Sequence, residues 1–179
     1  NWKNAARLQN NTVVGTIMSN LGLERFLASI GVSLVRTDVG DRHIIECMRE
    51  HGYNLGGEQS GHIIMSDYSK TGDGLVAALQ ILAIVQKEGR PVSEVCRRFE
   101  PVPTIERKAP LKGRQPLEDA NVIRVIEQCR AEVEEKGGRL IVRPSGTEPI
   151  IRIMVESDDL DLNEVVADRI IDAIGTVKE

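Results

Sequence analysis

The first half of the chain alternates short β-branched runs with stretches of helical periodicity, and this alternation limits the possible folds most strongly. The apolar run over residues 12–18 is short enough for a buried strand. Residues 21–30 place apolar side chains on one helical stripe and are followed by Gly31, a typical helix stop. Strands separated by helices predict an α/β layer domain whose sheet is covered on both faces.

The rest of this half continues the pattern. Residues 32–36 predict a second strand, residues 39–51 a helix, and residues 62–65 a third strand. Asp73 is a suitable N-cap for a helix over residues 75–86. Because this helix is apolar on nearly every side, we expect it to be central.

The pattern changes at residues 87–91, where Lys-Glu-Gly-Arg-Pro punctuates the chain. Beyond it we expect a short helix over residues 92–99, an extended segment between prolines over residues 102–109, and an amphipathic helix over residues 121–135. Two neighbouring strands, over residues 139–143 and 150–156, and a closing helix over residues 162–174 should follow. Strands joined by a tight loop and flanked by helices predict a small α+β domain on an antiparallel sheet. We therefore expect two domains, 1–88 and 89–179.

Charge and composition exclude some classes of function. The net charge of −4 argues against a nucleic-acid-binding surface, which usually carries a basic excess. No apolar run approaches the roughly 20 residues that span a bilayer. The cysteines are widely spaced among apolar neighbours, which indicates reduced thiols in the cytoplasm. The first residues show neither an initiator Met nor a signal pattern, so we expect a piece of a longer protein.

The segment with the sharpest chemistry covers residues 143–149 and reads Arg-Pro-Ser-Gly-Thr-Glu-Pro. A phosphate dianion is held best by a fork-shaped guanidinium, small hydroxyls and backbone N–H groups. The candidates for such a site are Arg143, Ser145, Gly146 and Thr147, with Arg152 shortly after them. The alternative is an ordinary turn between two strands, which uses the same residue types. The residues alone leave both readings open.

A second segment, residues 56–62, reads Gly-Gly-Glu-Gln-Ser-Gly-His at the entrance to a strand. Paired glycines let a backbone approach a ligand closely. Glu58, Ser60 and His62 offer an acceptor, a hydroxyl and an imidazole, which suit a polyhydroxylated ligand and proton transfer. The alternative is a glycine turn whose histidine satisfies a local backbone group.

Two further polar clusters favour structural roles. Asp41, Arg42 and His43 stand at a helix start, where a ligand could bind but where caps and first-turn charges are commoner. The acidic cluster over residues 158–161 resembles a metal loop but precedes a helix, so we interpret it as capping. Neither of the usual glycine-rich nucleotide-binding motifs occurs in the sequence.

Together these segments resemble the α-D-phosphohexomutase superfamily. Residues 57–62 resemble its sugar-binding loop, and residues 143–149 resemble its phosphate-binding loop. The bacterial phosphoglucosamine mutase branch is the most similar in residues 16–24 (Thr-Ile-Met-Ser-Asn-Leu-Gly-Leu-Glu), 39–42 (Val-Gly-Asp-Arg) and 60–64. The matches occur in order over nearly the whole chain, and together they favour the ligand-binding readings of both loops.

The resemblance implies the third of the family's four domains, lacking its beginning, and the fourth. The fold class is then α/β, with a truncated α/β/α layer domain on a mixed sheet followed by a small α+β domain with an antiparallel sheet and packed helices. The implied activity interconverts glucosamine 6-phosphate and glucosamine 1-phosphate through a bisphosphorylated sugar. A phosphoserine of the first domain would donate phosphate, and Mg²⁺ in the second would stabilise the transferring group. Such an isomerase, an intramolecular phosphotransferase, belongs to amino-sugar metabolism and the cytoplasmic synthesis of cell-wall precursors.

Carried over to this sequence, the resemblance implies that Glu58 and Ser60 hold sugar hydroxyls. His62 would lie beside the transferred phosphoryl group as a candidate acid or base. The residues implied to clamp the phosphate that is not reacting are Arg143, Ser145, Gly146, Thr147 and Arg152. The implied partner is a phosphosugar substrate, without nucleic acid or membrane, and the sequence says nothing of oligomeric state.

The chain also departs from the family pattern. No segment resembles the catalytic Ser-His-Asn-Pro loop or the Asp-Gly-Asp-x-Asp-Arg metal loop, and residues 40–42 share only three letters with the latter. We therefore expect Mg²⁺ to be bound by a domain absent from this chain, and the chain alone to be inactive. The alternatives are a phosphomannomutase/phosphoglucomutase or a non-catalytic phosphosugar-binding module.

Overall fold

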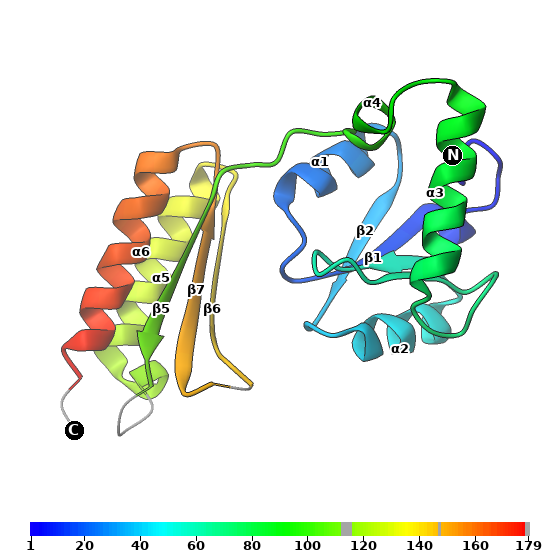
Figure 1. Cartoon of the computed structure of the whole chain (residues 1–179). Helices are drawn as coiled ribbons and strands as arrows, with labels where there is room; N and C mark the ends of the chain where they lie inside the picture. The colour runs from blue at the N-terminus through cyan, green and yellow to red at the C-terminus, as the bar shows by residue number, and fades with distance from the viewer. Residues whose placement is uncertain (112–115, 147, 178–179) are drawn as a thin grey trace. The chain divides into compact units, whose positions relative to one another are not determined.

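The computed structural model of the protein describes residues 1–111, 116–146 and 148–177. The chain divides into two compact units, Asn1–Pro101 and Val102–Glu179 (Figure 1). The change in sequence pattern suggested a boundary after residue 88, whereas the two units divide after residue 101. Residues 89–101 stay with unit 1 because α4 (Val92–Cys96) buries Val95 and the Phe99 ring stacks on Phe26 at 6.3 Å.

Unit 1 contains a mixed four-stranded sheet of order β2-β1-β3-β4. Its strands are β1 (Thr12–Thr16), β2 (Ser33–Thr37), β3 (Leu55–Gly57) and β4 (Ile63–Met65). β1 is parallel to β2 and β3, and β4 returns antiparallel to β3. β3 was not predicted from the sequence, because glycines fill two of its three positions and leave no alternating pattern.

Besides α4, this unit contains α1 (Leu21–Ser29), α2 (Asp41–His51) and α3 (Gly74–Glu88), and a 3₁₀ turn (η1, Gln9–Asn11) precedes β1. α1 and α3 begin at polar caps: Asn20 accepts from the Gly22 amide, and Asp73 accepts from the Leu75 and Val76 amides. A capping side chain satisfies backbone N–H groups that the first helical turn leaves unpaired.

The best-buried core of unit 1 lies between α2 and the sheet. Val14, Ile44, Met48 and Ile64 form this cluster, each at most 3% exposed. On the other face of the sheet Val13 is paired with Leu34, and both remain half-buried. The α2 face therefore holds the tighter packing.

The expectation that residues 75–86 form a central helix is wrong. Within α3 Ala77 is buried, whereas Leu75 is 72% exposed and Leu79 and Leu82 are more than half exposed. The main contacts of α3 are with α4 and β4, so its other sides lack packing partners in the described part of the chain.

Among the described residues, no helix has both the length and the apolar character needed to cross a bilayer.

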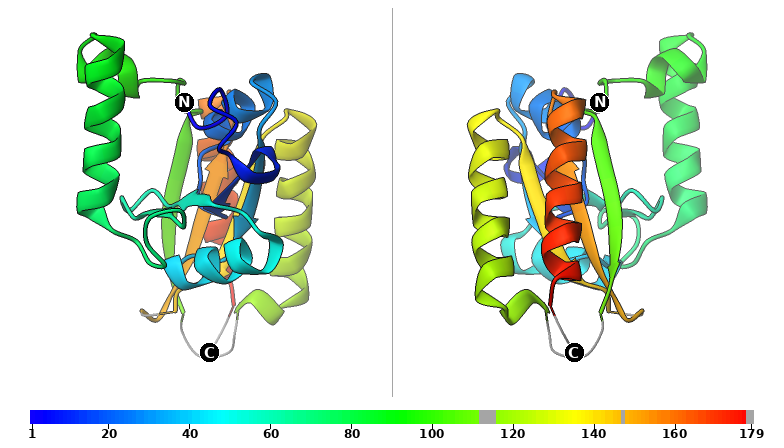
Figure 2. Two further views of the ribbon diagram at one scale, coloured as in Figure 1. Left: turned by 90° about the vertical axis from the view of Figure 1, so that its right-hand side faces the viewer. Right: turned by 90° about the vertical axis from the view of Figure 1, so that its left-hand side faces the viewer.

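Unit 2 is an antiparallel sheet covered on one face by two helices. The sheet has the order β5-β7-β6 and consists of β5 (Thr104–Pro110), β6 (Arg139–Pro144) and β7 (Ile150–Glu156). A 3₁₀ turn (η2, Pro116–Glu118) precedes α5 (Ala120–Glu135), and α6 (Leu160–Gly175) closes the unit. Figure 2 shows α5 and α6 side by side over the sheet. The predicted α+β architecture is confirmed, and the extended segment between the prolines is the third strand.

The core of unit 2 combines the inward faces of all these elements. Ile151, Ile153 and Val155 of β7 alternate into it and are at most 1% exposed. Val122 and Cys129 of α5 pack against them and are fully buried. The alternation of β7 leaves Arg152 on the opposite face of the sheet, which the helices do not cover.

Candidate functional site

Three loops follow the carboxyl ends of the parallel strands of unit 1. Residues 17–20 follow β1, residues 38–40 follow β2, and residues 58–62 follow β3. The carboxyl ends of parallel strands meet at one edge of a sheet, where open α/β sheets bind ligands. The strand order therefore gathers the three loops at one edge.

The loop over residues 58–62 turns the chain from β3 into β4. The Glu58 amide donates to the His62 carbonyl, and the Gly61 amide donates to the Glu58 carbonyl, each at 3.0 Å. Gly61 has a φ of +96°, which glycine adopts without strain. The glycine-rich segment is thus a closed hairpin that fixes the positions of its side chains.

Three predicted site residues converge within this hairpin. Nδ1 of His62 lies 2.8 Å from Oε1 of Glu58 and 2.9 Å from Oγ of Ser60. The Glu58 side chain is only 9% exposed, whereas the His62 side chain is 58% exposed. An ionised carboxylate only accepts hydrogen bonds, so Glu58 favours the tautomer of His62 with its proton on Nδ1.

This arrangement gives the hairpin a defined proton acceptor. Nε2 of His62 has no hydrogen-bond partner among the described residues and carries the lone pair of the neutral ring. Glu58 and Ser60 were expected to hold sugar hydroxyls. In this structure Oε1 of Glu58 and Oγ of Ser60 are engaged in positioning the imidazole.

A cavity of about 350 Å³ opens beside the hairpin. Glu58, Gln59 and His62 line it from the hairpin, and Ser19 and Asn20 line it from the loop after β1. Its volume falls within the usual range of small-ligand sites. Sequence reasoning did not place Ser19 and Asn20 beside the hairpin. Oγ of Ser19 accepts from the Thr16 amide, and Oδ1 of Asn20 accepts from the Gly22 amide.

The side chains at the start of α2 behave as first-turn charges. Nε of Arg42 donates to Oε1 of Glu46 at 2.9 Å, and Nδ1 of His43 lies 3.9 Å from the other oxygen of that carboxylate. The hydrogen bond from Arg42 holds the pKa of Glu46 below its usual range. These contacts within one helix agree with the structural interpretation of Arg42 and His43.

The predicted phosphate loop joins β6 to β7. The Ser145 amide donates to the Ile150 carbonyl at 2.8 Å, which closes the loop at its base. Nε of Arg152 lies 3.5 Å from Oγ of Ser145, and its guanidinium forms an ion pair with Glu148. Arg143 is paired with Arg152 across the two strands. The structure thus brings Arg143, Ser145 and Arg152 together.

The other two predicted residues of this loop are Gly146 and Thr147. A Cβ added to Gly146 would meet no described atom within 4 Å, so space is open beside its backbone. Thr147 lies outside the described residues.

Arg143 carries a polar atom that lacks a partner among the described residues. Its Nε is buried and has no hydrogen-bond acceptor within the described part of the chain. Its Nη1 reaches the carbonyl of Pro144 at 3.4 Å. A buried donor left unpaired costs about 1–3 kcal/mol, which an anion at this loop would offset.

The acidic cluster of unit 2 caps a helix, as expected. Asp159 accepts a hydrogen bond from the Leu162 amide at 3.0 Å at the start of α6. Among the described residues, no group of three histidine, cysteine, aspartate or glutamate side chains is placed to hold a metal ion.

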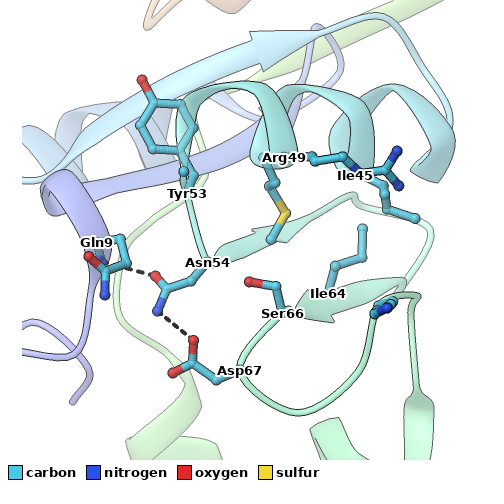
Figure 3. A pocket seen from close by; sticks show the side chains of 11 residues that line it. Gln9, Ile45, Arg49, Tyr53, Asn54, Ile64, Ser66 and Asp67 are labelled. Carbon is cyan, nitrogen blue, oxygen red and sulfur yellow. Dashed lines mark hydrogen bonds between the residues drawn. The ribbon is translucent and has the colours of Figure 1, made fainter.

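Unit 1 also contains a cavity of about 550 Å³ beside α2 (Figure 3). Oδ1 of Asn54 accepts a hydrogen bond from the backbone N–H of Gln9, and Nδ2 of Asn54 donates to Oδ1 of Asp67, each at 2.9 Å, as the dashed lines in Figure 3 show. These polar groups satisfy one another. Because no residue predicted from the sequence lines this cavity, it is not part of the candidate site.

Comparison with protein families gives two consecutive matches. Residues 1–102 match the phosphoglucomutase/phosphomannomutase α/β/α domain III, and residues 104–173 match the C-terminal domain of the same family. The matches meet where the two compact units divide.

The chain is also similar to curated bacterial proteins. It is 58% identical to the phosphoglucosamine mutase of Beijerinckia indica subsp. indica over 174 residues, 97% of the chain and 38% of that protein. It is 57% identical to the phosphoglucosamine mutase of Methylobacterium radiotolerans over 173 residues, with the same coverage. The chain therefore spans about 38% of the length of these relatives.

Solved structures share the fold at low sequence identity. The N-acetylphosphoglucosamine mutase of Aspergillus fumigatus, in complex with GlcNAc-6P and magnesium, matches with a TM-score of 0.75 and 18% identity over 95% of this chain and 42% of that chain. An N-acetylglucosamine-phosphate mutase of the α-D-phosphohexomutase superfamily, in the product complex, matches with a TM-score of 0.72 and 18% identity over 90% and 38%. These matches confirm the predicted fold class.

Proposed function

The chain belongs to the phosphoglucomutase/phosphomannomutase family, and on that premise we propose that it is the substrate-recognition part of a phosphoglucosamine mutase. The longer protein would interconvert glucosamine 6-phosphate and glucosamine 1-phosphate through a bisphosphorylated sugar. The choice of an amino sugar is supported by the bacterial relatives, which bear that enzyme's name and are more than half identical to the chain.

The observation that carries the proposal is the buried Nε of Arg143, which has no hydrogen-bond partner among the described residues and lies at a loop with a hydroxyl and open space. Arg143, Ser145 and Arg152 surround one end of the sheet of unit 2, and Gly146 leaves room beside them. A guanidinium fork and a hydroxyl are the groups that hold a phosphate dianion best. We assign this loop to the phosphate group of the substrate that is not reacting.

The hairpin of unit 1 supplies the proton chemistry in this proposal. Phosphoryl transfer to the sugar forms a bond from phosphorus to a hydroxyl oxygen and releases the hydroxyl proton. It breaks the bond to the donor serine oxygen, which takes up a proton from a group of the longer protein outside this chain. Nε2 of His62 accepts the hydroxyl proton, and Glu58 stabilises the resulting imidazolium through Nδ1. In the reverse transfer the same nitrogen returns the proton.

Two separate recognition loops suit a reaction in which the sugar must turn around. The bisphosphorylated intermediate presents first one phosphate and then the other to the same donor group. A loop that holds whichever phosphate is distal, and a hairpin that handles the reacting hydroxyl, serve both orientations. Binding energy from the distal phosphate then fixes the reacting end.

The groups that transfer the phosphoryl lie outside this chain in the proposal. The chain contains neither a catalytic serine loop nor an aspartate loop like those of the family. Magnesium would be held by another part of the longer protein, where it would stabilise the transferring group. We therefore expect the chain alone to be inactive, because no covalent phosphoenzyme can form on it.

A coupled assay of the longer protein tests the activity. With magnesium and a bisphosphate activator, kcat/KM should be highest for glucosamine 6-phosphate, and the 179-residue chain should show no turnover above background. A higher kcat/KM for mannose or glucose phosphates would favour the phosphomannomutase/phosphoglucomutase alternative. Absence of turnover with every phosphosugar would favour a non-catalytic binding module.

A phosphate titration followed by NMR tests the loop assignment on the chain itself. The largest shifts should fall on residues 143–152, and Arg143→Ala should weaken binding by roughly tenfold to hundredfold, since a charge-assisted hydrogen bond contributes about 1.5–3 kcal/mol. Shifts centred on residues 57–62, with binding unchanged in Arg143→Ala, would assign the phosphate to the hairpin instead.

A further inference from the structure

The sheet of unit 2 aligns three cations in one cross-strand row. Lys108 of β5 is paired with Arg152 of β7, and Arg152 is paired with Arg143 of β6. Residues directly opposite each other on a sheet have Cβ atoms about 5 Å apart on the same face. These three residues, the cation row, therefore share the face of this sheet that α5 and α6 do not cover.

A second row on this face is balanced in charge. Glu156 of β7 is paired with Thr104 on one side and Arg139 on the other. Its Oε1 accepts from Oγ1 of Thr104 at 3.2 Å, and its carboxylate forms an ion pair with Arg139. A buried carboxylate between a hydroxyl and a guanidinium is compensated within its own row.

The cation row has no such compensation from its own strands. Glu148, from the loop, pairs with Arg152, so three cations face one carboxylate. Glu106, the next residue of β5 on this face, is paired with Met154 instead. Lys108 is exposed and forms no hydrogen bond or ion pair with the described residues.

Like charges directly opposite each other destabilise a sheet, so this row carries an energetic cost in the free protein. The row and Glu148 leave an excess of two positive charges. A phosphate group carries about −1.5 to −2 charges near neutral pH, which matches that excess. A bound phosphate would relieve the repulsion that the free sheet bears.

We propose that Lys108 is a third cationic residue of the phosphate site, and this inference rests on the proposed function of the Arg143 loop. Lys108 stands one strand beyond Arg152, so it acts on the phosphate by Coulomb attraction across the row. A compact ammonium on a flexible stem suits that role, whereas the two guanidinium groups supply the directed hydrogen bonds. The phosphate site therefore extends over all three strands.

Phosphate titration of the full chain tests this role. Lys108→Gln should weaken phosphate binding about three- to tenfold at low ionic strength, because it removes one unit charge near a dianion. Lys108→Arg should restore the affinity to within about twofold. The loss in Lys108→Gln should shrink as salt is added, because the Debye length shortens.

Arg107→Gln is the matched control. Arg107 is the neighbour of Lys108 on β5 and pairs with Asp168 of α6 at 3.4 Å, on the helix-covered side. The variant makes the same change in net charge but should leave the phosphate affinity nearly unchanged. An equal loss in both variants would overturn the inference, since net charge alone would then explain it.

Urea unfolding without phosphate gives an independent readout. Lys108→Gln should raise the urea midpoint, because it relieves repulsion from Arg152. A lower midpoint together with weaker phosphate binding would give Lys108 a structural role and overturn the inference.

Arg143→Ala, measured in parallel, separates the two proposals. If Arg143→Ala weakens binding and Lys108→Gln does not, the role of Lys108 is wrong and the loop assignment stands. If neither variant changes the affinity, both fail.

Discussion

Oε1 of Glu58 lies 2.8 Å from Nδ1 of His62, and the Glu58 side chain is only 9% exposed while the His62 side chain is 58% exposed. His62, which a substrate can reach, is thus held in place by Glu58, which is poorly accessible to a substrate. Glu58 is best understood as a positioning residue for His62, in addition to any contact with sugar hydroxyls. The pair resembles the general arrangement in which a buried carboxylate fixes the tautomer of a histidine base.

Replacing Glu58 with Gln in the longer protein should lower kcat more than it changes KM. The amide removes the charge that stabilises a protonated imidazole, while the side chain keeps its size. We expect a fall in kcat of roughly tenfold to a thousandfold, because positioned acid–base groups contribute on this order. Steady-state kinetics on the amino-sugar phosphate measures it. Glu46→Gln, which removes the partner of Arg42 on α2, should leave kcat unchanged.

Gly56→Ala should destabilise unit 1. A Cβ at this position would lie 2.5 Å from Cγ2 of Ile44 and 2.8 Å from Sδ of Met48. Overpacking a core of this kind costs about 1–3 kcal/mol. Urea unfolding should show that loss in the free energy of unfolding. Gly74→Ala is the control, because an added Cβ there meets no described atom within 4 Å; an equal loss in both variants would contradict the packing argument.

Much of this fold could be predicted because periodicity records which side of an element is buried. The helices over residues 120–135 and 160–175 lie within about two residues of the predicted spans, since each has a continuous apolar stripe. The same rule predicted the helix α3 within about two residues but wrongly placed it at the centre of its domain. Its sequence is apolar on several sides, but burial also requires neighbours, and the described chain places few beside it.

The sequence indicated which residues of the hairpin lie close together, but not which contacts their side chains make. Spacing brought Glu58, Ser60 and His62 together because they belong to one hairpin. It could not show that the first two engage the imidazole, since that depends on the unpredicted strand β3. The row formed by Lys108 and Arg152 depends on strand register between segments far apart in sequence, which no local pattern records.

Asn163 should be among the residues on which the stability of unit 2 depends most. It is fully buried, and its Nδ2 donates to the carbonyls of Pro103 at 3.1 Å and Ser157 at 3.2 Å. Its Oδ1 accepts from Oγ of Ser157 at 2.6 Å. Asn163→Leu leaves these groups without partners and should lower the free energy of unfolding by about 2–4 kcal/mol. Asn121→Leu, on the exposed side of α5, should change it by less than about 0.5 kcal/mol.

Denaturant titrations of the three proteins measure these differences. Hydrogen exchange adds the location, because Pro103 immediately precedes β5 and Ser157 immediately follows β7, so Asn163→Leu should loosen the amides at these ends of the two strands. A loss of stability in Asn121→Leu as large as that in Asn163→Leu would mean that apolar substitution in a helix, and not the buried network, is responsible.

The last prediction concerns alkaline pH and Cys129. This thiol is fully buried in the core of unit 2, and burial raises its pKa above the ordinary value of 9.0. Glu132 also raises the pKa, and Arg169 opposes both effects. The folded state therefore keeps the thiol proton at a pH where the unfolded chain has lost it.

The sign follows from that difference. The unfolded state binds fewer protons above about pH 9, so the free energy of unfolding should fall as the pH rises beyond that value, and the contribution is fully present below it. Cys129→Ala removes the titrating group, so its stability should fall less steeply over the same range, although its absolute stability is lower. Cys96 is exposed, so Cys96→Ala should keep the slope of the original chain. Urea unfolding at a series of alkaline pH values measures all three slopes. Parallel curves for Cys129→Ala and the original chain would show that the buried thiol titrates alike in both states, against the expectation from its burial.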